Sequence, residues 1–169
     1  MDHGDIYHKM SLAETICNLL DPHAGERVDA SMVNIANDRG ETLLHWMCVY
    51  DRYDIVLQLL EHGANPNRLD NVRGSPLHWA VCSNSLYIAN ILMDNGAKVN
   101  ISDERGWTPL HYAASKGAYC MASELIRHGA NTLAVDDECM NPTTIAIRHG
   151  HMKTSRLISD MDMSHKKIE

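Results

Sequence analysis

The chain has 169 residues, of which 44% are hydrophobic and 22% are charged, and this is the size and composition of a single folded domain. Disordered, fibrous and low-complexity proteins are therefore excluded. With 15 Lys and Arg against 22 Asp and Glu, the formal charge is −7, which disfavours nucleic acid as a partner. No apolar run approaches the length of about 18 residues that a membrane span requires, so no membrane partner is expected.

The first residues and the cysteines favour a reducing compartment. The first ten residues are polar and acidic, so we expect neither a signal peptide nor a transit peptide. The five cysteines are an odd, widely spaced set without a CxxC motif, whereas a secreted disulfide framework pairs an even set. We therefore expect a soluble, intracellular chain with small buried thiols.

Residues 1–33 are predicted to form an N-terminal capping helix followed by an insertion. The helix precedes Pro22, and its apolar residues lie on one face. These residues are Leu12, Ile16, Leu19 and Leu20. The following stretch 21–31 is longer than the later pattern requires, which indicates the insertion.

A period of 33 residues runs through the rest of the chain. Histidines occur with this step within TLLHWM, SPLHWA and TPLHYA, at His45, His78 and His111. A Gly-Ala pair follows each histidine after 18 residues, beginning at Gly63, Gly96 and Gly129. The period predicts repeats at 34–69, 70–102 and 103–135. A degraded capping repeat at 136–160, where Thr144 replaces the histidine, and a frayed tail at 161–169 complete the prediction.

Each copy contains the signals for two short helices and an extended finger. Thr108 stands where a side-chain oxygen can cap a helix, and Pro109 follows at the first helical position, where its missing N–H costs nothing. Apolar residues then recur at helical spacing, and a glycine such as Gly129 ends the second helix in a left-handed conformation. Isolated helices of this length are marginal in water, so the copies must stack on one another.

The finger of the second copy departs from the pattern. Arg73 stands where the neighbouring copies have Gly40 and Gly106. Because arginine tolerates a positive φ poorly, we expect a locally altered finger at residues 70–74.

The period and its T-P-L-H-x-A signature resemble the ankyrin repeat over residues 34–158. The resemblance implies an all-α ankyrin-repeat solenoid of helix-turn-helix units with β-hairpin-like fingers. It also implies that His45, His78 and His111 are structural residues, which hydrogen-bond their own turn and the neighbouring one. Asn67 and Asn100 resemble sites of asparaginyl hydroxylation.

No pattern for catalysis or metal binding is found. HExxH, a Walker loop and GxSxG are all absent from the sequence. Cys139, His149 and His151 do not have the spacing of an established zinc site, and the carboxylates at 136–138 are expected to be solvated. We therefore expect no enzymatic activity, no cofactor and no metal.

The resemblance implies that a partner binds the concave face, at positions where each repeat points to solvent. The predicted partner-binding residues are Arg39, Glu41, Tyr50, Val72, Arg105, Trp107 and Lys116. Aromatic and Arg side chains are enriched at interface centres, so Trp107 is the predicted anchor, whose truncation would weaken binding and barely change stability. The alternative is that Trp107 packs on Lys116 or on a neighbouring finger and stabilises the stack.

The sequence thus favours a non-enzymatic module that binds a protein partner as a small adaptor or inhibitor, similar to viral or pathogen NF-kappa-B inhibitor-like ankyrin proteins. The alternative is a regulatory or targeting domain of a larger enzyme or channel. A monomer is expected, located in the cytoplasm and also in the nucleus.

Overall fold

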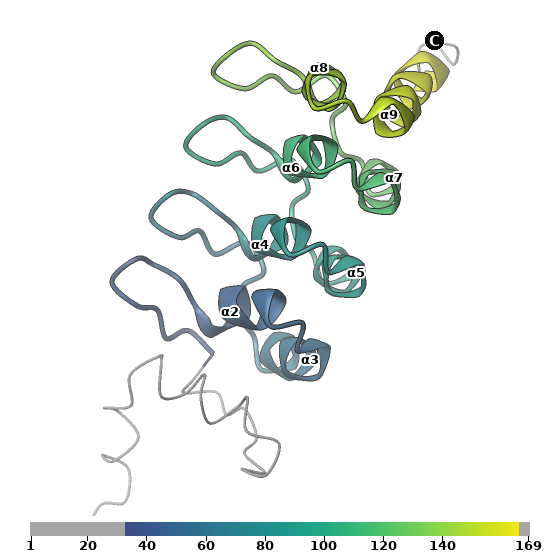
Figure 1. Cartoon of the computed structure of the whole chain (residues 1–169). Coiled ribbons are helices and arrows are strands. Elements are labelled where there is room, and N and C mark those ends of the chain that lie inside the picture. Colours follow the sequence, from purple (N-terminus) through teal and green to yellow (C-terminus); the bar gives the residue numbers. More distant parts are fainter. Residues whose placement is uncertain (1–32, 166–169) are drawn as a thin grey trace, which may run out of the picture.

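The computed structural model describes residues 33–165 and the side chains of residues 33–160. Eight α-helices in this range form two rows, and fingers project from the inner row (Figure 1). The inner helices are α2 (Leu43–Val49), α4 (Pro76–Cys82), α6 (Pro109–Ser115) and α8 (Pro142–Arg148). The outer helices are α3 (Tyr53–Glu61), α5 (Leu86–Asp94), α7 (Tyr119–Arg127) and α9 (Met152–His165). The result is an open stack of four helix pairs, as the solenoid prediction requires.

The two ends of the chain are only partly covered by this description. The predicted N-terminal capping helix and insertion lie outside the described residues, apart from Val33 at their end. At the other end, α9 continues to His165, so residues 161–165 of the predicted frayed tail are helical. None of the helices in the described range has the length and apolarity to traverse a bilayer.

The inner helices begin at the capping residues that the sequence predicted. Ser75 and Thr108 are N-caps with extended backbone, and Pro76 and Pro109 occupy the first helical positions. In both helices the N-cap side chain faces the backbone of the third helical residue, and that residue's ring faces the N-cap backbone in return. Since a capping box satisfies N–H groups that a helix start leaves unpaired, each seven-residue helix has a defined beginning.

The outer helices end at the glycines that the period predicted. Gly63, Gly96 and Gly129 have φ values of 87°, 84° and 86°, which only glycine adopts readily. After each of them the chain turns back and hydrogen-bonds the end of the helix, as in the 2.9 Å bond from Ala97 N to Leu92 O. These turns direct the chain from the outer row into the next finger.

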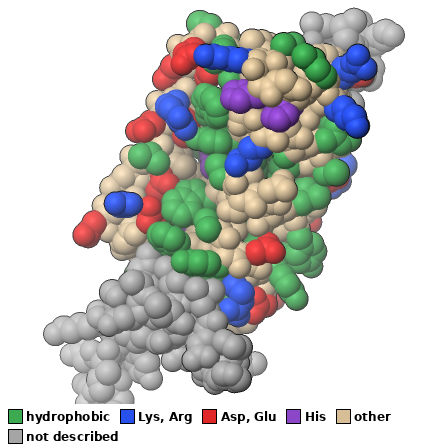
Figure 2. Space-filling model, in the orientation of Figure 1, with side chains coloured by type: hydrophobic (Ala, Val, Ile, Leu, Met, Phe, Trp, Pro, Cys, Tyr) green, Lys and Arg blue, Asp and Glu red, His purple; other side chains and the backbone are tan. Residues whose placement is uncertain are grey.

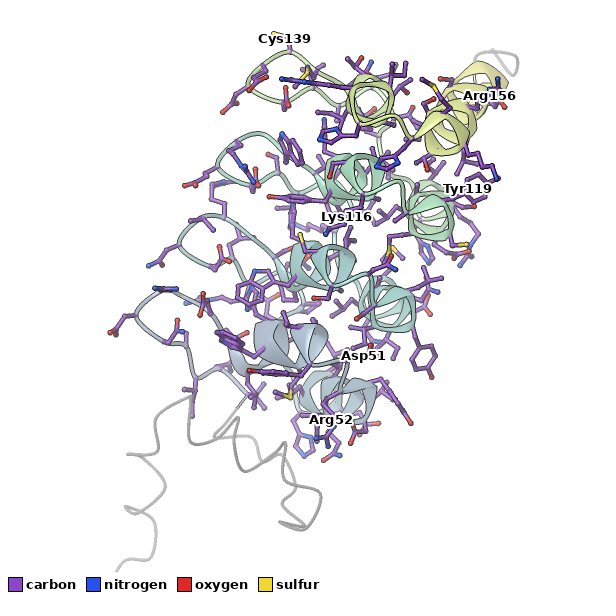
Figure 3. All side chains as sticks on the ribbon, in the orientation of Figure 1. Asp51, Arg52, Lys116, Tyr119, Cys139 and Arg156 are labelled. Atoms are coloured by element: carbon purple, nitrogen blue, oxygen red, sulfur yellow. The ribbon has the colours of Figure 1, made fainter. Side chains whose placement is uncertain are left out.

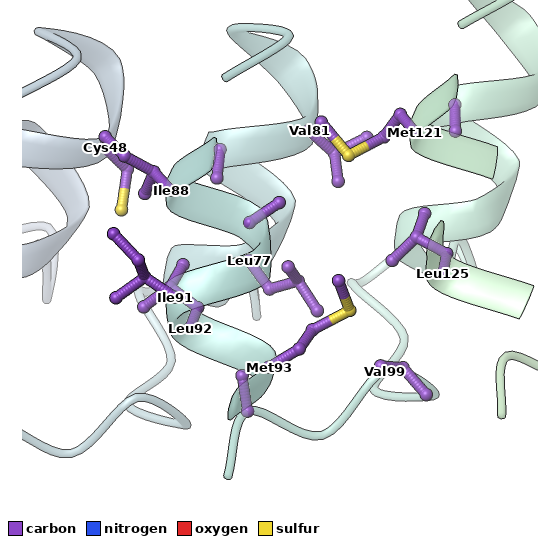
Figure 4. Close-up of a cluster of buried hydrophobic side chains, with 14 of the residues drawn as sticks. Cys48, Leu77, Val81, Ile88, Ile91, Leu92, Met93, Val99, Met121 and Leu125 are labelled. Atoms are coloured by element: carbon purple, nitrogen blue, oxygen red, sulfur yellow. The ribbon is translucent and has the colours of Figure 1, made fainter. Parts of the chain in front are cut away.

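The core lies between the two rows and runs continuously along the stack. Neighbouring inner helices contact one another, as do neighbouring outer helices, and the two helices of each repeat also pack together. In Figure 4, Leu77 of α4, Ile88 and Leu92 of α5, and Met121 and Leu125 of α7 belong to one buried cluster. Truncating a buried leucine of this kind to alanine typically costs about 2–5 kcal/mol, so the repeats stabilise one another.

The finger of the second repeat is regular, and the prediction of an altered finger at 70–74 is wrong. Arg73 itself adopts a positive φ of 63°, and the turn keeps the hydrogen bonds of the other fingers, from Asp70 N to Gly74 O at 2.9 Å and from Arg73 N to Asp70 O at 3.0 Å. Consecutive fingers are also linked, because Asn71 N donates to Arg39 O at 2.8 Å. The surrounding hydrogen bonds thus hold an arginine in a conformation that it disfavours alone.

Candidate functional site

The concave face is built from the fingers and the inner helices, and each finger is closed by one polar side chain. In the third finger, Asp103 Oδ1 accepts the backbone N–H groups of Arg105 at 2.8 Å and Trp107 at 2.9 Å. Asp70 and Asp136 make the same pair of bonds in their own fingers, and Asn37 does so in the first. The fingers are therefore rigid, pre-organised loops.

The second carboxylate oxygen of each aspartate binds an aromatic side chain. Asp70 Oδ2 accepts from Trp79 Nε1 at 3.0 Å, and Asp103 Oδ2 accepts from the Tyr112 hydroxyl at 2.6 Å. Asp136 Oδ2 accepts from Trp107 Nε1 at 3.0 Å, which connects the third finger to the fourth. Trp79, Tyr112 and Trp107 are therefore fixed by charge-assisted hydrogen bonds.

The sequence prediction missed these aspartates. The carboxylate of Asp136 was expected to be solvated with its two neighbours, but the residue is only 5% exposed, whereas Asp137 and Glu138 are exposed as expected. The missed signal is the period itself, since Asp70, Asp103 and Asp136 recur at the same 33-residue step as the histidines.

The repeated histidines have the structural role that the resemblance implied. In α4, His78 Nδ1 accepts from Ser75 N at 3.1 Å and lies 2.8 Å from the Ser75 hydroxyl, while its Nε2 reaches the Trp107 carbonyl of the next repeat at 3.1 Å. His45 and His111 make the corresponding contacts in α2 and α6. Burial lowers the pKa of all three rings, so they are neutral and link adjacent repeats.

A cavity of about 190 Å³ opens on this face between the second and third repeats. Its lining comprises Val49, Asp70, Val72, Gly74, His78, Trp79, Cys82, Ser83, Asp103 and Tyr112. Figure 2 shows hydrophobic side chains gathered between the fingers and the helices, with charged side chains beside them. The expectation of small buried thiols holds for Cys48 but is wrong for Cys82, Cys120 and Cys139, which are exposed. The cavity wall still desolvates the Cys82 sulfur and raises its pKa, and burial together with the bond to Asp103 raises the pKa of Tyr112 to about 12.

Five of the seven predicted partner-binding residues are exposed. They are Arg39, Tyr50, Val72, Arg105 and Lys116. Val72 is 51% exposed and lines the cavity, while Tyr50 is 45% exposed and its ring stacks on Trp46. Arg105 Nη2 donates to the Tyr112 hydroxyl at 2.9 Å, which places this cation beside the cavity.

The other two predicted partner-binding residues are not free surface side chains. Glu41 is 8% exposed, and its carboxylate accepts from Asn37 Nδ2 at 2.6 Å, so it closes the first finger from within. Trp107 is half-buried, packs against the core and meets the Tyr112 ring edge-on at 4.9 Å. Together with its bond to Asp136, this packing corresponds to the alternative in which Trp107 stabilises the stack.

The remaining histidines do not assemble a metal site in the part of the chain that the structure describes. No group of three or more His, Cys, Asp or Glu side chains there is arranged to hold a metal ion. Cys139 lies on the last finger (Figure 3), whereas His149 Nδ1 is 2.9 Å from the Ile145 carbonyl and His151 Nε2 is 3.1 Å from the Ser115 carbonyl.

The finger asparagines are likewise engaged within the stack. Asn67 Nδ2 donates to Gly96 O at 2.9 Å, and its Oδ1 accepts from Lys98 N at 2.7 Å. Asn100 makes the equivalent bonds to Gly129 O and Asn131 N. Each asparagine thus joins one repeat to the next.

Comparison with protein families agrees with the geometry. The model of the family described as ankyrin repeats (3 copies) matches residues 8–103 and again residues 77–167. The chain therefore belongs to the ankyrin repeat family, whose members generally mediate protein–protein interactions and are typically non-enzymatic. A search of curated proteins finds no match to the sequence.

Proposed function

We propose that this chain binds a protein partner through its concave face and acts as a small adaptor or inhibitor. The observation that carries the proposal is the cavity between the second and third repeats, together with the exposed apolar side chains at its edge, Val49 and Val72. Exposed apolar side chains around a cavity are typical of interaction sites, because their burial against a partner releases the water that covers them.

The construction of the surface also suits recognition of a folded or extended protein chain. The fingers are closed by Asp70 and Asp103, and the wall between them is formed by Trp79 and Tyr112, which are held by those carboxylates. A rigid surface loses little conformational entropy when a partner binds, so more of the contact energy appears as affinity. Aromatic residues and arginine are also enriched in protein interfaces.

We propose that the action is by binding alone, without a cofactor. The one thiol in the cavity lining is that of Cys82, an exposed residue whose sulfur is desolvated enough to raise its pKa, which disfavours the nucleophilic thiolate. The proposed location is the cytoplasm and the nucleus, supported by the widely spaced, odd set of cysteines.

The test uses two exposed tyrosines that each contact another aromatic ring, one on the inner row of helices and one on the outer row. Tyr50 at the end of α2 stacks on Trp46, and Tyr87 on the outer helix α5 meets Tyr53 edge-on, and both are exposed. Immobilised full chain, Tyr50→Ser and Tyr87→Ser would be used to capture proteins from a cell extract, with bound proteins identified by mass spectrometry. Loss of a specific protein only with Tyr50→Ser supports binding at the concave face. Loss only with Tyr87→Ser would place the interface on the outer helices and refute the proposal.

A further inference from the structure

The charges at the edge of the cavity differ from those of the whole chain. The chain carries −7, but the two carboxylates in the cavity lining are buried, and each already accepts two backbone N–H groups and one aromatic donor. Asp70 and Asp103 therefore have little capacity left for a cationic ligand. The exposed charges beside the cavity are the cations Arg105 and Lys116 and the anion Glu104, whose backbone N–H donates to Val72 O at 3.1 Å.

Two cationic residues hydrogen-bond Tyr112, one through its side chain and one through its backbone. Arg105 Nη2 donates to the Tyr112 hydroxyl, and the Arg105 side chain is 63% exposed. Lys116 caps the same helix, and its backbone N–H bonds the Tyr112 carbonyl, so it stands one turn further along α6. Lys116 also lies near the Cys82 sulfur in the cavity wall, where its positive charge acts on the thiol.

Of the two cations, Lys116 is the one available for a new ion pair. Arg105 lies 4.0 Å from the Asp103 carboxylate and also feels the charge of its neighbour Glu104. Lys116 is exposed and has no ion pair with any residue in the described part of the chain. Figure 3 places Lys116 on the inner row, beside the neighbouring helix α4.

The cavity next to these cations has the size for one apolar side chain. Its volume is about 190 Å³, and its lining includes the apolar and aromatic side chains of Val49, Val72, Trp79 and Tyr112. An apolar cavity of about 150 Å³ is large enough to hold benzene. A single leucine or aromatic side chain therefore fits, whereas a helix face does not.

Building on the proposed function, we propose that the partner presents a short acidic segment with one large apolar side chain. The apolar side chain fills the cavity between Val72 and Tyr112, and a carboxylate within a few residues of it pairs with Lys116. The net charge of −7 does not oppose this pairing at physiological salt, because charges beyond about 8–10 Å are largely screened. Nearby, Glu104 acts on Arg105, whereas Lys116 has no ion pair in the described part of the chain.

The experiment selects ligands without assuming their sequence. A random peptide library displayed on phage is selected against the immobilised full chain, and the most enriched peptides are synthesised with a fluorophore for measurement of Kd. The expected peptides carry Asp or Glu within about three residues of a Leu, Ile, Phe or Trp. Replacing that apolar residue with Ala should weaken binding by about tenfold or more, and replacing the acidic residue with Gln should weaken it about two- to fivefold.

Protein variants then locate the two contacts. Lys116→Gln should weaken the acidic peptide about two- to fivefold and leave its Gln version unchanged, while Lys153→Gln on the outer helix α9 leaves both unchanged. Val72→Ser should weaken both peptides, and its matched control is Leu133→Ser, at a position that is 52% exposed. Thermal melting of each variant confirms that the fold is intact.

The outcomes separate this inference from the proposed function. Selected peptides that are neutral or basic, but sensitive to Val72→Ser, would overturn the acidic segment and leave the concave binding site standing. Equal effects of Lys116→Gln and Lys153→Gln on peptide affinity would also overturn the acidic segment and leave the concave binding site standing. Peptides that are insensitive to both Val72→Ser and Tyr50→Ser would overturn the inference and the proposed function together. Failure of the library to enrich any peptide would contradict recognition of a short segment. The concave binding site would then still be tested by the capture of proteins from a cell extract with Tyr50→Ser and Tyr87→Ser.

Discussion

Replacing Trp107 tests whether this residue stabilises the stack or serves only as a binding anchor. The indole Nε1–H donates to Asp136 at 3.0 Å, and the ring meets Tyr112 edge-on and stacks against His111 at 6.2 Å. The Arg105 guanidinium lies over the Trp107 ring, 5.3 Å from its centroid. One side chain thus connects the third finger, the inner helix α6 and the fourth finger.

The expected cost follows from these contacts. A fully buried tryptophan truncated to alanine costs about 3–5 kcal/mol, and a half-buried one that also loses a hydrogen bond should cost about 2–3 kcal/mol. Trp107→Phe keeps most of the ring but removes the N–H donor to Asp136, so it should cost about 1 kcal/mol. Tyr50→Ala removes an exposed ring and should cost less than about 1 kcal/mol.

The assay is equilibrium unfolding in urea, followed by circular dichroism, for Trp107→Ala, Trp107→Phe and Tyr50→Ala. A double-mutant cycle with Asp136→Asn isolates the hydrogen bond, because the cost of Asp136→Asn should shrink once Trp107 is already phenylalanine. A free energy of unfolding for Trp107→Ala within about 0.5 kcal/mol of the wild type would refute this reasoning. It would return Trp107 to the role of a free surface anchor.

Two further predictions concern the fingers and the histidines. Gly106→Ala should destabilise by more than Gly96→Ala, although both glycines have positive φ, because a Cβ at Gly106 would lie 2.9 Å from the Asp136 Cα whereas one at Gly96 meets no atom within 4 Å. Urea unfolding should give about 1–2 kcal/mol for Gly96→Ala and a larger value for Gly106→Ala, and equal values would show that the fingers can move apart. Stability should also fall as the pH drops below about 6.5, because burial lowers the pKa of the repeated histidines in the folded state and the unfolded chain takes up protons first. Unfolding between about pH 7.5 and 5.5 measures this slope, which His78→Gln should flatten, and a protein that gains stability on acidification would contradict the assignment.

The fold could be predicted from the sequence because its signals are local and repeated. A cap such as Ser75 and the proline after it mark where an inner helix begins, and a glycine such as Gly96 marks where an outer helix ends. These signals recur at the same spacing. Arg73 shows where this reasoning fails. Its intrinsic preference opposes a positive φ, but the finger is held by Asp70 and by the neighbouring finger, so tertiary hydrogen bonds determine the local conformation.

The candidate site was only partly predictable, because burial in a finger depends on the next repeat. The pattern predicted that Val72, Arg105 and Lys116 point to solvent, and all three are exposed. It predicted the same for Trp107, but the carboxylate that binds this indole belongs to Asp136, in the following repeat. Assigning positions within one repeat at a time cannot reveal a hydrogen bond to the next repeat.

The first repeat shows how one atom changes the arrangement of the concave wall. Asn37 stands where the later fingers have aspartate, and its Oδ1 closes the turn in the same way. Its second polar atom is an amide nitrogen, a donor, so it needs an acceptor, and Glu41 supplies one from a buried position. The first finger therefore has no counterpart of the carboxylates that bind Trp79 and Tyr112 in the later fingers. Trp46 Nε1, at the equivalent position, has no hydrogen-bond partner among the described residues. The buried Glu41 thus accepts from the amide that Asn37 presents where the later fingers have a second carboxylate oxygen, so one pair of polar atoms accounts for a side chain that the repeat register alone placed at the surface.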